Sequence, residues 1–363
     1  MIDTNYKILL PQDFQAMVQS LNLNDFYFPR LFPLRQTYDL TWRTAEGTRG
    51  RHVAGDLVAR GASYPENTRE VFSRLQGDIP KTAIKRTKDE NDIIKFNLML
   101  QNAGSDANKR ALINLIFEDI DYVYQGVQAR LEWYALQTIS TGKVQLTMDN
   151  NNSAVTEADI DYDLESWQKN GVQTSWNSTQ SADPFIDFKN IVKDARSKGI
   201  SLKYCFMNMD TWNQFSMTEQ VIKRSATMAQ NLTSTATEPS LEQVNSILRR
   251  VPYLNGLQII VLDQDITVEK ADKTWVTGNP FVDNVCLFSE SNTLGETFWV
   301  RPADADVQGT AGYKVLNRAT IVKQYGEEEP IRETTSASAN AIPVWKGSTR
   351  SYLLKTNNTS WDL

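Results

Sequence analysis

The chain has 363 residues, of which 40% are hydrophobic and 23% charged, and its formal net charge is -6. This balance is typical of a folded protein of about two domains and excludes a disordered chain. The net acidity argues against a broad basic face for duplex DNA, but a protein that merely encloses DNA remains compatible with it. No apolar run approaches the roughly 20 residues that span a bilayer, and the N-terminal segment lacks a long apolar stretch. We therefore expect neither a membrane span nor a signal peptide.

The two cysteines, Cys205 and Cys286, each lie inside an apolar, strand-like segment. Buried cysteines of this kind are usually free thiols in a reducing compartment, which we favour here over a disulfide. The sequence therefore predicts synthesis in the cytoplasm.

The charge is unevenly distributed along the chain. Residues 1–100 contain 14 Lys and Arg against 12 Asp and Glu, so the excess of acidic residues lies in the remaining 263. A basic N-terminal portion on an acidic body suits a subunit that reaches across its neighbours, although two solvated loops would give the same pattern. The basic residues are concentrated at Arg43, Arg49 and Arg51, and again at Lys81, Lys85, Arg86 and Lys88.

The N-terminal 34 residues predict a short helix followed by an arm. A short amphipathic helix fits residues 1–20, although Pro11 limits it. Residues 26–34 are aromatic and interrupted by Pro29 and Pro33, and proline pushes the preceding residue towards an extended conformation. We therefore expect no helix there, but an extended apolar arm that packs on another surface.

Residues 41–95 are rich in Arg, Gly, Thr and Asp and contain only short β-prone pieces. No compact apolar pattern emerges, which predicts a long two-stranded excursion and not a domain.

The strongest periodic signal runs from Asn108 to Thr141. Its apolar residues follow spacings of three and four, which place them along one face of a helix. About thirty residues at 1.5 Å each give a rod of roughly 45 Å, well beyond the common helix length. Gly142 is the expected C-terminal cap. The stripe consists of Leu112, Ile116, Ile120, Val123, Val127, Leu131 and Tyr134.

Two half-buried strands are expected next, because apolar and polar residues alternate over 144–148 and 160–164. The acidic residues between and within them superficially resemble a calcium loop. However, Leu164 occupies the position where such a loop needs glycine, and Asn170 the position where it needs glutamate. The carboxylates Glu157, Asp159, Asp161, Asp163 and Glu165 therefore predict one solvated strand face.

Residues 183–304 are typical of an α/β unit. Asp183-Pro184 begins a helix that Gly199 ends, and a strand follows at 202–207. Ser240 and Gln243 form a capping-box pattern before a helix that Pro252 terminates. Continuous apolar runs at 257–262 and 284–288 predict buried strands. Alternation resumes in the tail from residue 312, with further strand-like pieces at 342–345 and 352–354.

The sequence offers no catalytic, metal or cofactor motif. His52 is the only histidine, so a Ser/His/Asp or Cys/His system would depend on it. The chain lacks a G-x-S-x-G elbow, a P-loop, a G-x-G-x-x-G segment and a plausible set of zinc ligands. A hydrolase using Asp159, Asp161 and Asp163 remains the enzyme alternative, but their alternation places them on an open face. The nine tryptophans are interpreted as core and interface anchors.

These features, in this order, resemble the lambda-like E family of major capsid proteins of tailed bacteriophages. The resemblance rests on the aromatic segment 26–32, the extended piece VAGDLVARG at 53–61, Gly77 to Lys81, the long helix, Glu329-Pro330 and Ile342-Pro343-Val344. The resemblance covers nearly the whole chain and depends on the order of several short motifs more than on any one of them.

The resemblance implies an α+β chain with the Hong Kong 97 phage capsid fold. The implied parts are an N-terminal arm (1–40), an extended β loop (41–95), a peripheral domain with a long spine helix (96–165), an axial α/β domain (166–304) and a return to the peripheral domain (305–363). The arm and loop would reach over adjacent subunits. The candidates for subunit contact are Phe26, Phe28, Arg30, Phe32, Arg49, Arg51, Lys81, Lys85, Arg86 and Lys88.

The implied function is self-assembly, without catalysis, into pentamers and hexamers of an icosahedral head that encloses double-stranded DNA without sequence-specific binding. The implied partners are a separate scaffolding protein, a portal and a decoration protein, and we expect no Lys–Asn cross-link between subunits. The implied location is the virion, after assembly in the host cytoplasm. Two alternatives stay open: another phage structural protein, such as a tail or neck component, and a bacterial compartment shell protein of the same fold.

Overall fold

The computed structural model describes residues 11–46, 73–101, 106–147, 150–151, 159–228, 238–254, 256–270, 272–306 and 312–361. The chain divides into two compact units, each assembled from segments that are distant in sequence. Unit 1 comprises Met1–Trp42, Gly77–Ala135 and Glu296–Val344, and unit 2 comprises Arg43–Gln76, Leu136–Gly295 and Trp345–Leu363. Helices and strands both contribute to each, so the predicted α+β class is confirmed.

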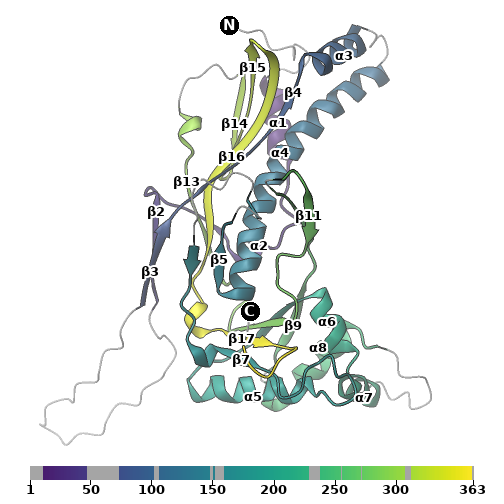
Figure 1. Ribbon diagram of the computed structural model, residues 1–363, viewed down its shortest axis with the longest axis vertical. Coiled ribbons are helices and arrows are strands. Elements are labelled where there is room, and N and C mark those ends of the chain that lie inside the picture. The colour runs from purple at the N-terminus through teal and green to yellow at the C-terminus, as the bar shows by residue number, and fades with distance from the viewer. Residues whose placement is uncertain are drawn as a thin grey trace, which may run out of the picture. The chain divides into compact units, whose positions relative to one another are not determined.

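Unit 1 is built on a sheet and on one long helix, α4 (Asp106–Thr141), whose residues up to Ala135 belong to this unit (Figure 1). The sheet has the strand order β1-β13-β16-β15-β14, and β4 also pairs with β16. Its longest strand, β16, has 15 residues and pairs antiparallel with both β15 and β4. The strand bounds are β1 (Leu34–Gln36), β4 (Lys81–Lys88), β13 (Gly295–Val300), β14 (Tyr313–Asn317), β15 (Thr320–Glu328) and β16 (Ile331–Trp345).

Helix α4 has 36 residues, which corresponds to about 54 Å, and Gly142 follows it at a φ of +76°. The predicted helix and its glycine cap are therefore confirmed. Described members of the predicted stripe, from Ile116 to Tyr134, are buried, and from Leu131 onward the helix is buried on nearly every side. Strand β4 approaches α4 closely at Gly126, where an added Cβ would lie 2.7 Å from the Cδ1 of Ile84.

The N-terminal segment contains two helices, α1 (Pro11–Ser20) and α2 (Phe28–Leu31). Helix α1 packs on β14, where Phe14 stacks on Tyr313 with ring centroids 5.3 Å apart. The four-residue α2 corrects our expectation of a wholly extended arm. Pro29 lies in its first turn, where the missing N–H has no intrahelical partner to lose, so proline is compatible with a helix at this place.

Only part of residues 41–95 is the predicted two-stranded excursion. Strands β2 (Thr41–Glu46) and β3 (Ser73–Asp78) do form a two-stranded ribbon, and residues 47–72 lie outside the described residues. Strand β4, however, belongs to the sheet of unit 1, and helix α3 (Glu90–Gln101) follows it. The excursion therefore ends before Lys81, because the lysine-bearing strand pairs along its whole length with β16.

Unit 2 contains a sheet with the strand order β7-β17-β12-β8-β9. Its apolar core collects residues from the sheet and from helices α5 and α8, including Phe188, Cys205, Ile247 and Phe288. The strand bounds are β7 (Lys169–Gly171), β8 (Tyr204–Asn208), β9 (Gln258–Leu262), β12 (Val285–Ser289) and β17 (Tyr352–Lys355). The helices are α5 (Pro184–Ser197), α6 (Met209–Ser216), α7 (Glu219–Met228) and α8 (Leu241–Arg250).

The predicted helix boundaries in unit 2 are confirmed by their caps. The Oδ1 of Asp183 accepts a hydrogen bond from the backbone N–H of Phe185 at 3.1 Å, and Gly199 follows α5 at a φ of +75°. The Ser240–Gln243 capping box is present at α8, and Pro252 comes directly after its last turn.

Two further predictions for unit 2 have different outcomes. Strands β5 (Lys143–Gln145) and β6 (Asp159–Asp161) pair as expected, with Tyr162 and Leu164 buried and Asp161 and Asp163 exposed. Strand β17, which we expected within a peripheral return, instead pairs with β12 and β7 in the sheet of unit 2. The four residues of β17 are all buried, so the core of unit 2 includes the chain's last strand.

Candidate assembly surfaces

The N-terminal segment is fastened to the long helix by a buried carboxylate. Glu132 of α4 has no exposed surface and accepts hydrogen bonds from the backbone N–H groups of Tyr27 at 3.1 Å and Phe28 at 2.6 Å. Tyr27 is the N-cap residue of α2 and makes no side-chain cap of its own, so Glu132 supplies the missing acceptor. Burial raises the pKa of Glu132 to about 7, and the two N–H donors oppose this rise.

The aromatic candidates for subunit contact lie inside unit 1. Phe28 and Phe32 have no exposed surface and Phe26 is 7% exposed. Since the chain's own residues already cover these rings, they stabilise the subunit and are not surfaces for a neighbour, which corrects our interpretation of the three. Arg30, between them, is exposed at the end of α2, and its contact with a neighbour remains a prediction.

The basic candidates on β4 divide between the two faces of the sheet. Arg86 and Lys88 point towards α4, where they bind the carboxylate of Asp119 at 3.2 and 2.5 Å. Lys81 lies on the opposite face and binds Asp304 at 3.3 Å, and Lys85 shares that face and is exposed. Arg49 and Arg51 lie outside the described residues.

Exposed apolar side chains mark two surfaces that the sequence patterns do not reveal. A ribbon formed by β10 (Ile266–Glu269) and β11 (Trp275–Gly278) exposes Trp275 by 70%, together with Val276. Helix α3 buries Ile93 and Phe96 but exposes Ile94, Leu98 and Met99. Aromatic side chains such as Trp275 are enriched at interfaces, so this ribbon is a candidate contact surface. The sequence alone supported only the general expectation that the tryptophans are core and interface anchors, without singling out Trp275.

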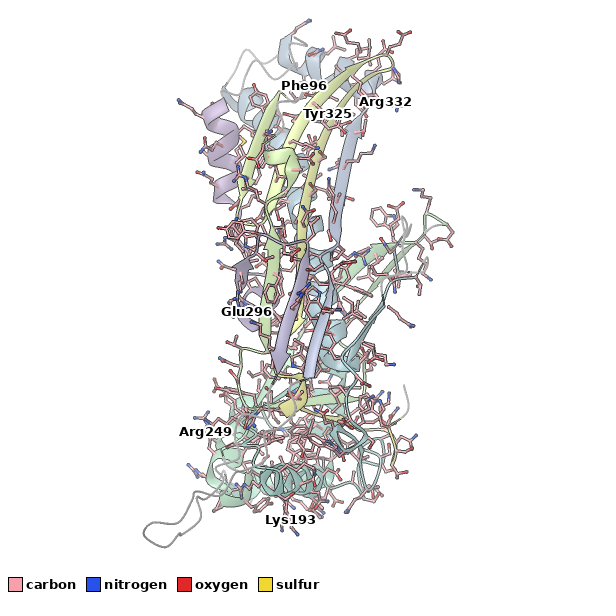
Figure 2. The ribbon with its side chains drawn as sticks, turned by 90° about the vertical axis from the view of Figure 1, so that its left-hand side faces the viewer. Phe96, Lys193, Arg249, Glu296, Tyr325 and Arg332 are labelled. Atoms are coloured by element: carbon pink, nitrogen blue, oxygen red, sulfur yellow. The ribbon has the colours of Figure 1, made fainter. Side chains whose placement is uncertain are left out.

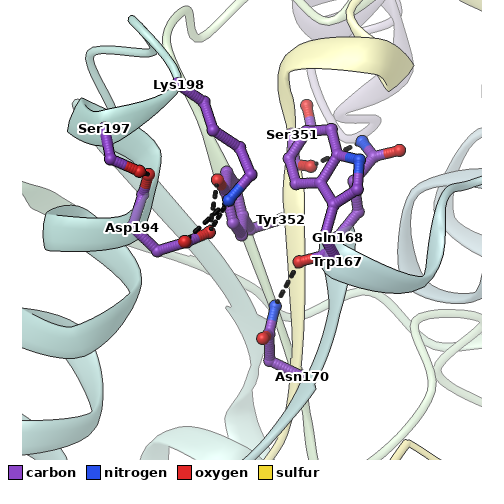
Figure 3. Close-up of polar contacts among 8 residues, drawn as sticks. All are labelled: Trp167, Gln168, Asn170, Asp194, Ser197, Lys198, Ser351 and Tyr352. Carbon is purple, nitrogen blue, oxygen red and sulfur yellow. Dashed lines mark hydrogen bonds and ion pairs between the residues drawn. The ribbon is translucent and has the colours of Figure 1, made fainter.

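A small polar cavity in unit 2 was the strongest remaining candidate for a ligand site. It has a volume of about 230 Å³ and is lined by Asn170, Asp187, Asp194, Tyr352 and neighbouring residues. These groups already have partners within the unit. The hydroxyl of Tyr352 donates to Asp194 at 2.9 Å, the Lys198 ammonium binds the same carboxylate at 2.6 Å, and Asn170 donates to the Trp167 carbonyl (Figure 3). Asp187 accepts from the indole N–H of Trp176 at 2.9 Å. Burial and the Asp194 carboxylate both raise the pKa of Tyr352. The cluster therefore stabilises the packing of α5 on β17.

The other titratable groups also fit a structural role. Cys205 and Cys286 are free and buried, as predicted, and burial together with a hydrogen bond to Cys286 raises the pKa of the Cys205 thiol. A thiol with a raised pKa is a poor nucleophile. Among the described residues, His, Cys, Asp and Glu nowhere gather in a group that could hold a metal ion. Within the same residues, no helix is long and apolar enough to cross a membrane.

Comparisons with known proteins identify the family. Residues 14–348 match the family model described as phage major capsid protein E, so this chain belongs to that family. No curated protein sequence matches the chain significantly. The match to the family model confirms the sequence resemblance over almost the entire chain.

Solved structures agree with this family in their fold. A prophage protein from Escherichia coli CFT073 described as a capsid protein is 12% identical, with 96% of this chain and 99% of that chain covered and a TM-score of 0.56. A chain of the capsid asymmetric unit of cyanophage A-1(L) is also 12% identical, with 93% and 94% covered and a TM-score of 0.51. An encapsulin complex from Synechococcus elongatus PCC 7942 is 9% identical over 94% and 92%, but its TM-score of 0.41 carries no argument for the compartment alternative.

The chain thus has the Hong Kong 97 phage capsid fold. It is a shell-forming structural protein of a bacteriophage, and its place is the virion.

Proposed function

We propose that copies of this chain form pentamers and hexamers of an icosahedral head around double-stranded DNA, which they hold without sequence-specific contacts. The observation that carries the proposal is a 36-residue helix to which the N-terminal segment is fastened by the Phe28–Glu132 hydrogen bond, in a chain of a capsid family. A helix of this length, about 54 Å, suits a wall element better than a compact core. The net charge of -6 supports enclosure of DNA without tight adhesion to it.

The parts of the subunit have separate proposed tasks. We assign the arm to residues 1–40, the extended loop to residues from 41 up to the start of β4, the peripheral part to unit 1 and the axial part to the sheet and helices of unit 2. The exposed Arg30 and the basic residues Arg49 and Arg51 are proposed contacts with neighbouring copies. The excess of Lys and Arg within residues 1–100, in a chain whose net charge is -6, favours association between copies through charge complementarity.

The proposed partners are a separate scaffolding protein, a portal and a decoration protein, with assembly in the host cytoplasm. Reduced, buried Cys205 and Cys286 are compatible with a reducing compartment. Because shell closure needs no chemical step from the subunit, no cofactor is part of the proposal.

The test is electron microscopy of the full chain, expressed alone and together with the product of the neighbouring candidate scaffold gene. We expect discrete icosahedral shells in the second case, and irregular or fewer particles in the first. Hollow helical tubes, or monomers under every condition, would contradict the proposal. Nuclease treatment of particles from infected cells distinguishes the contents: protected DNA supports a head, whereas a protein cargo would favour the compartment alternative.

A further inference from the structure

Four antiparallel strands of unit 1 bring three lysines and a serine into one row. Ser336 of β16 lies opposite Lys85 of β4 and opposite Lys323 of β15. Lys323 in turn lies opposite Lys314 of β14. Because residues directly opposite one another in an antiparallel sheet share a face, these four side chains form a continuous row across the sheet. We call them the lysine row.

The lysine row lies on the face of the sheet that α4 does not cover. On the helix side, Gln128 of α4 donates to the Oγ1 of Thr320 at 2.8 Å, and Ile84 lies against Gly126. Thr320 and Ile84 have the opposite parity to Lys323 and Lys85 on their strands, so they point to the other face. Figure 2 shows the sheet in front of α4, with Tyr325, which lies two residues beyond Lys323 on the same face, labelled.

The positive charge of this face is only partly compensated within the subunit. Asp304 binds both Lys323 at 3.0 Å and Lys81, on the same face, at 3.3 Å. Lys85 is exposed and makes no ion pair with any described residue. Lys314 and Lys323, the like charges directly opposite one another, lie near Asp306 and Asp304, so Lys85 is the position of the row at which a further anion adds most.

The buried hydroxyl in the row gives a second, independent sign of a missing partner. Ser336 is 8% exposed, and its Oγ has no hydrogen-bond partner among the described residues. A buried hydroxyl without a partner costs free energy, which an incoming acceptor between Lys85 and Lys323 would recover.

The same unit carries an exposed group of the opposite charge. Glu327 and Glu328 end β15, and Glu329 follows in the turn to β16. All three are exposed and form no ion pair with a described residue, although Arg332 lies opposite Glu327. Lys323 and Glu327 are four positions apart on β15, about 13 Å, so the turn is out of reach of the row in its own copy.

We propose that the lysine row receives the Glu327–Glu329 turn of a second copy of this chain. The contact joins two different surfaces and therefore propagates from one subunit to the next, as a closed shell requires. Phosphates of the enclosed DNA are the competing occupant, and the DNA content of the shells distinguishes the two. The inference rests on the assembly of copies into a shell and specifies one of its contacts.

Charge exchange in the full-length chain tests this contact. The variants are Lys85→Glu, Glu328→Lys and the two combined, with Lys193→Glu and Glu242→Lys as matched controls on exposed positions of unit 2. Light scattering measures the protein concentration at which assembly begins, under conditions in which the wild type forms shells. Thermal unfolding of the unassembled protein checks that each variant is folded.

We expect each single reversal at the contact to raise the assembly concentration by about tenfold, and the combined variant to return to within about twofold of the wild type. The two controls should behave like the wild type. Normal assembly of Lys85→Glu, or no recovery in the combined variant, would overturn the proposed contact. Normal shells of Lys85→Glu that retain less DNA would also overturn it, in favour of phosphate as the occupant. A wild-type chain that forms no shells at all would contradict the proposed function itself.

Discussion

The backbone N–H of Phe28 donates a 2.6 Å hydrogen bond to the Glu132 carboxylate, across 104 positions of the sequence. The bond is buried and joins the first turn of α2 to the last third of the long helix α4. A side chain from one helix thus replaces the N-cap of another, and the position of the N-terminal segment depends on it.

Replacing Glu132 by alanine should loosen this attachment. Two buried N–H groups, those of Tyr27 and Phe28, would lose their acceptor, and a cavity would form beside them. We expect a loss of about 2–4 kcal/mol in the free energy of unfolding, measured by urea denaturation of the unassembled chain. Glu132→Gln should lose less, because its amide oxygen keeps one acceptor. An alanine variant as stable as the wild type would show that the bond contributes nothing.

The same carboxyl should make stability depend on pH. Burial raises its pKa from an ordinary 4.5 to about 7, so the folded chain holds the proton more tightly than the unfolded chain does. The stabilising contribution is therefore complete below pH 4.5 and is lost as the pH rises through 7. The loss is on the order of 3 kcal/mol. Urea denaturation at about pH 5 and about pH 8 should show a larger decrease for the wild type than for Glu132→Gln. If the free energy of unfolding decreased equally with pH in the two proteins, the proposed role of Glu132 would be contradicted.

Sequence reasoning was most successful where a local signal decides the structure. The apolar stripe and Gly142 predicted α4, and Asp183 and Ser240 predicted the starts of α5 and α8, because caps and periodicity depend on neighbouring residues only. It was wrong about α2, since Pro29 is equally compatible with an extended chain and with a first helical turn.

The placement of β4 and β17 in their sheets could not be predicted, because it depends on pairing between segments that are distant in sequence. Lys81–Lys88 has the composition of a solvated loop, and only its pairing with β16 places Lys85 beside Ser336. Likewise, nothing local in Tyr352–Lys355 tells which of two sheets the strand joins. The lysine row is therefore visible only in the structure, whereas the basic character of β4 could be read from the sequence.

Asp119 should be required for the attachment of β4 to α4. It is 6% exposed and neutralises Lys88, whose side chain is only 16% exposed, and also Arg86. Asp119→Asn would remove a counter-charge from the largely buried Lys88 and from Arg86, at a cost of about 1–3 kcal/mol in the free energy of unfolding. Glu118→Gln, an exposed neighbour on the same helix, serves as the control and should be neutral. Equal denaturation midpoints for the two variants would contradict this role of the ion pair.

The C-terminal residues should depend on the absence of a side chain at Gly171. A Cβ added there would overlap the backbone carbonyl of Thr359, which cannot move like the end of a side chain. We expect Gly171→Ala to destabilise unit 2 by about 1–3 kcal/mol in thermal or urea unfolding. Gly278→Ala is the matched control, because nothing lies within 4 Å of its added Cβ.

A truncation separates this clash from other effects of alanine at position 171. Ending the chain after Asn358 removes Thr359 but keeps the 2.9 Å bond from the Val172 N–H to the Asn358 carbonyl. In that background Gly171→Ala should cost almost nothing, since the overlapping atoms are gone. An undiminished cost in the truncated chain would show that the strand β7 itself, and not the C-terminal segment, requires glycine at this position.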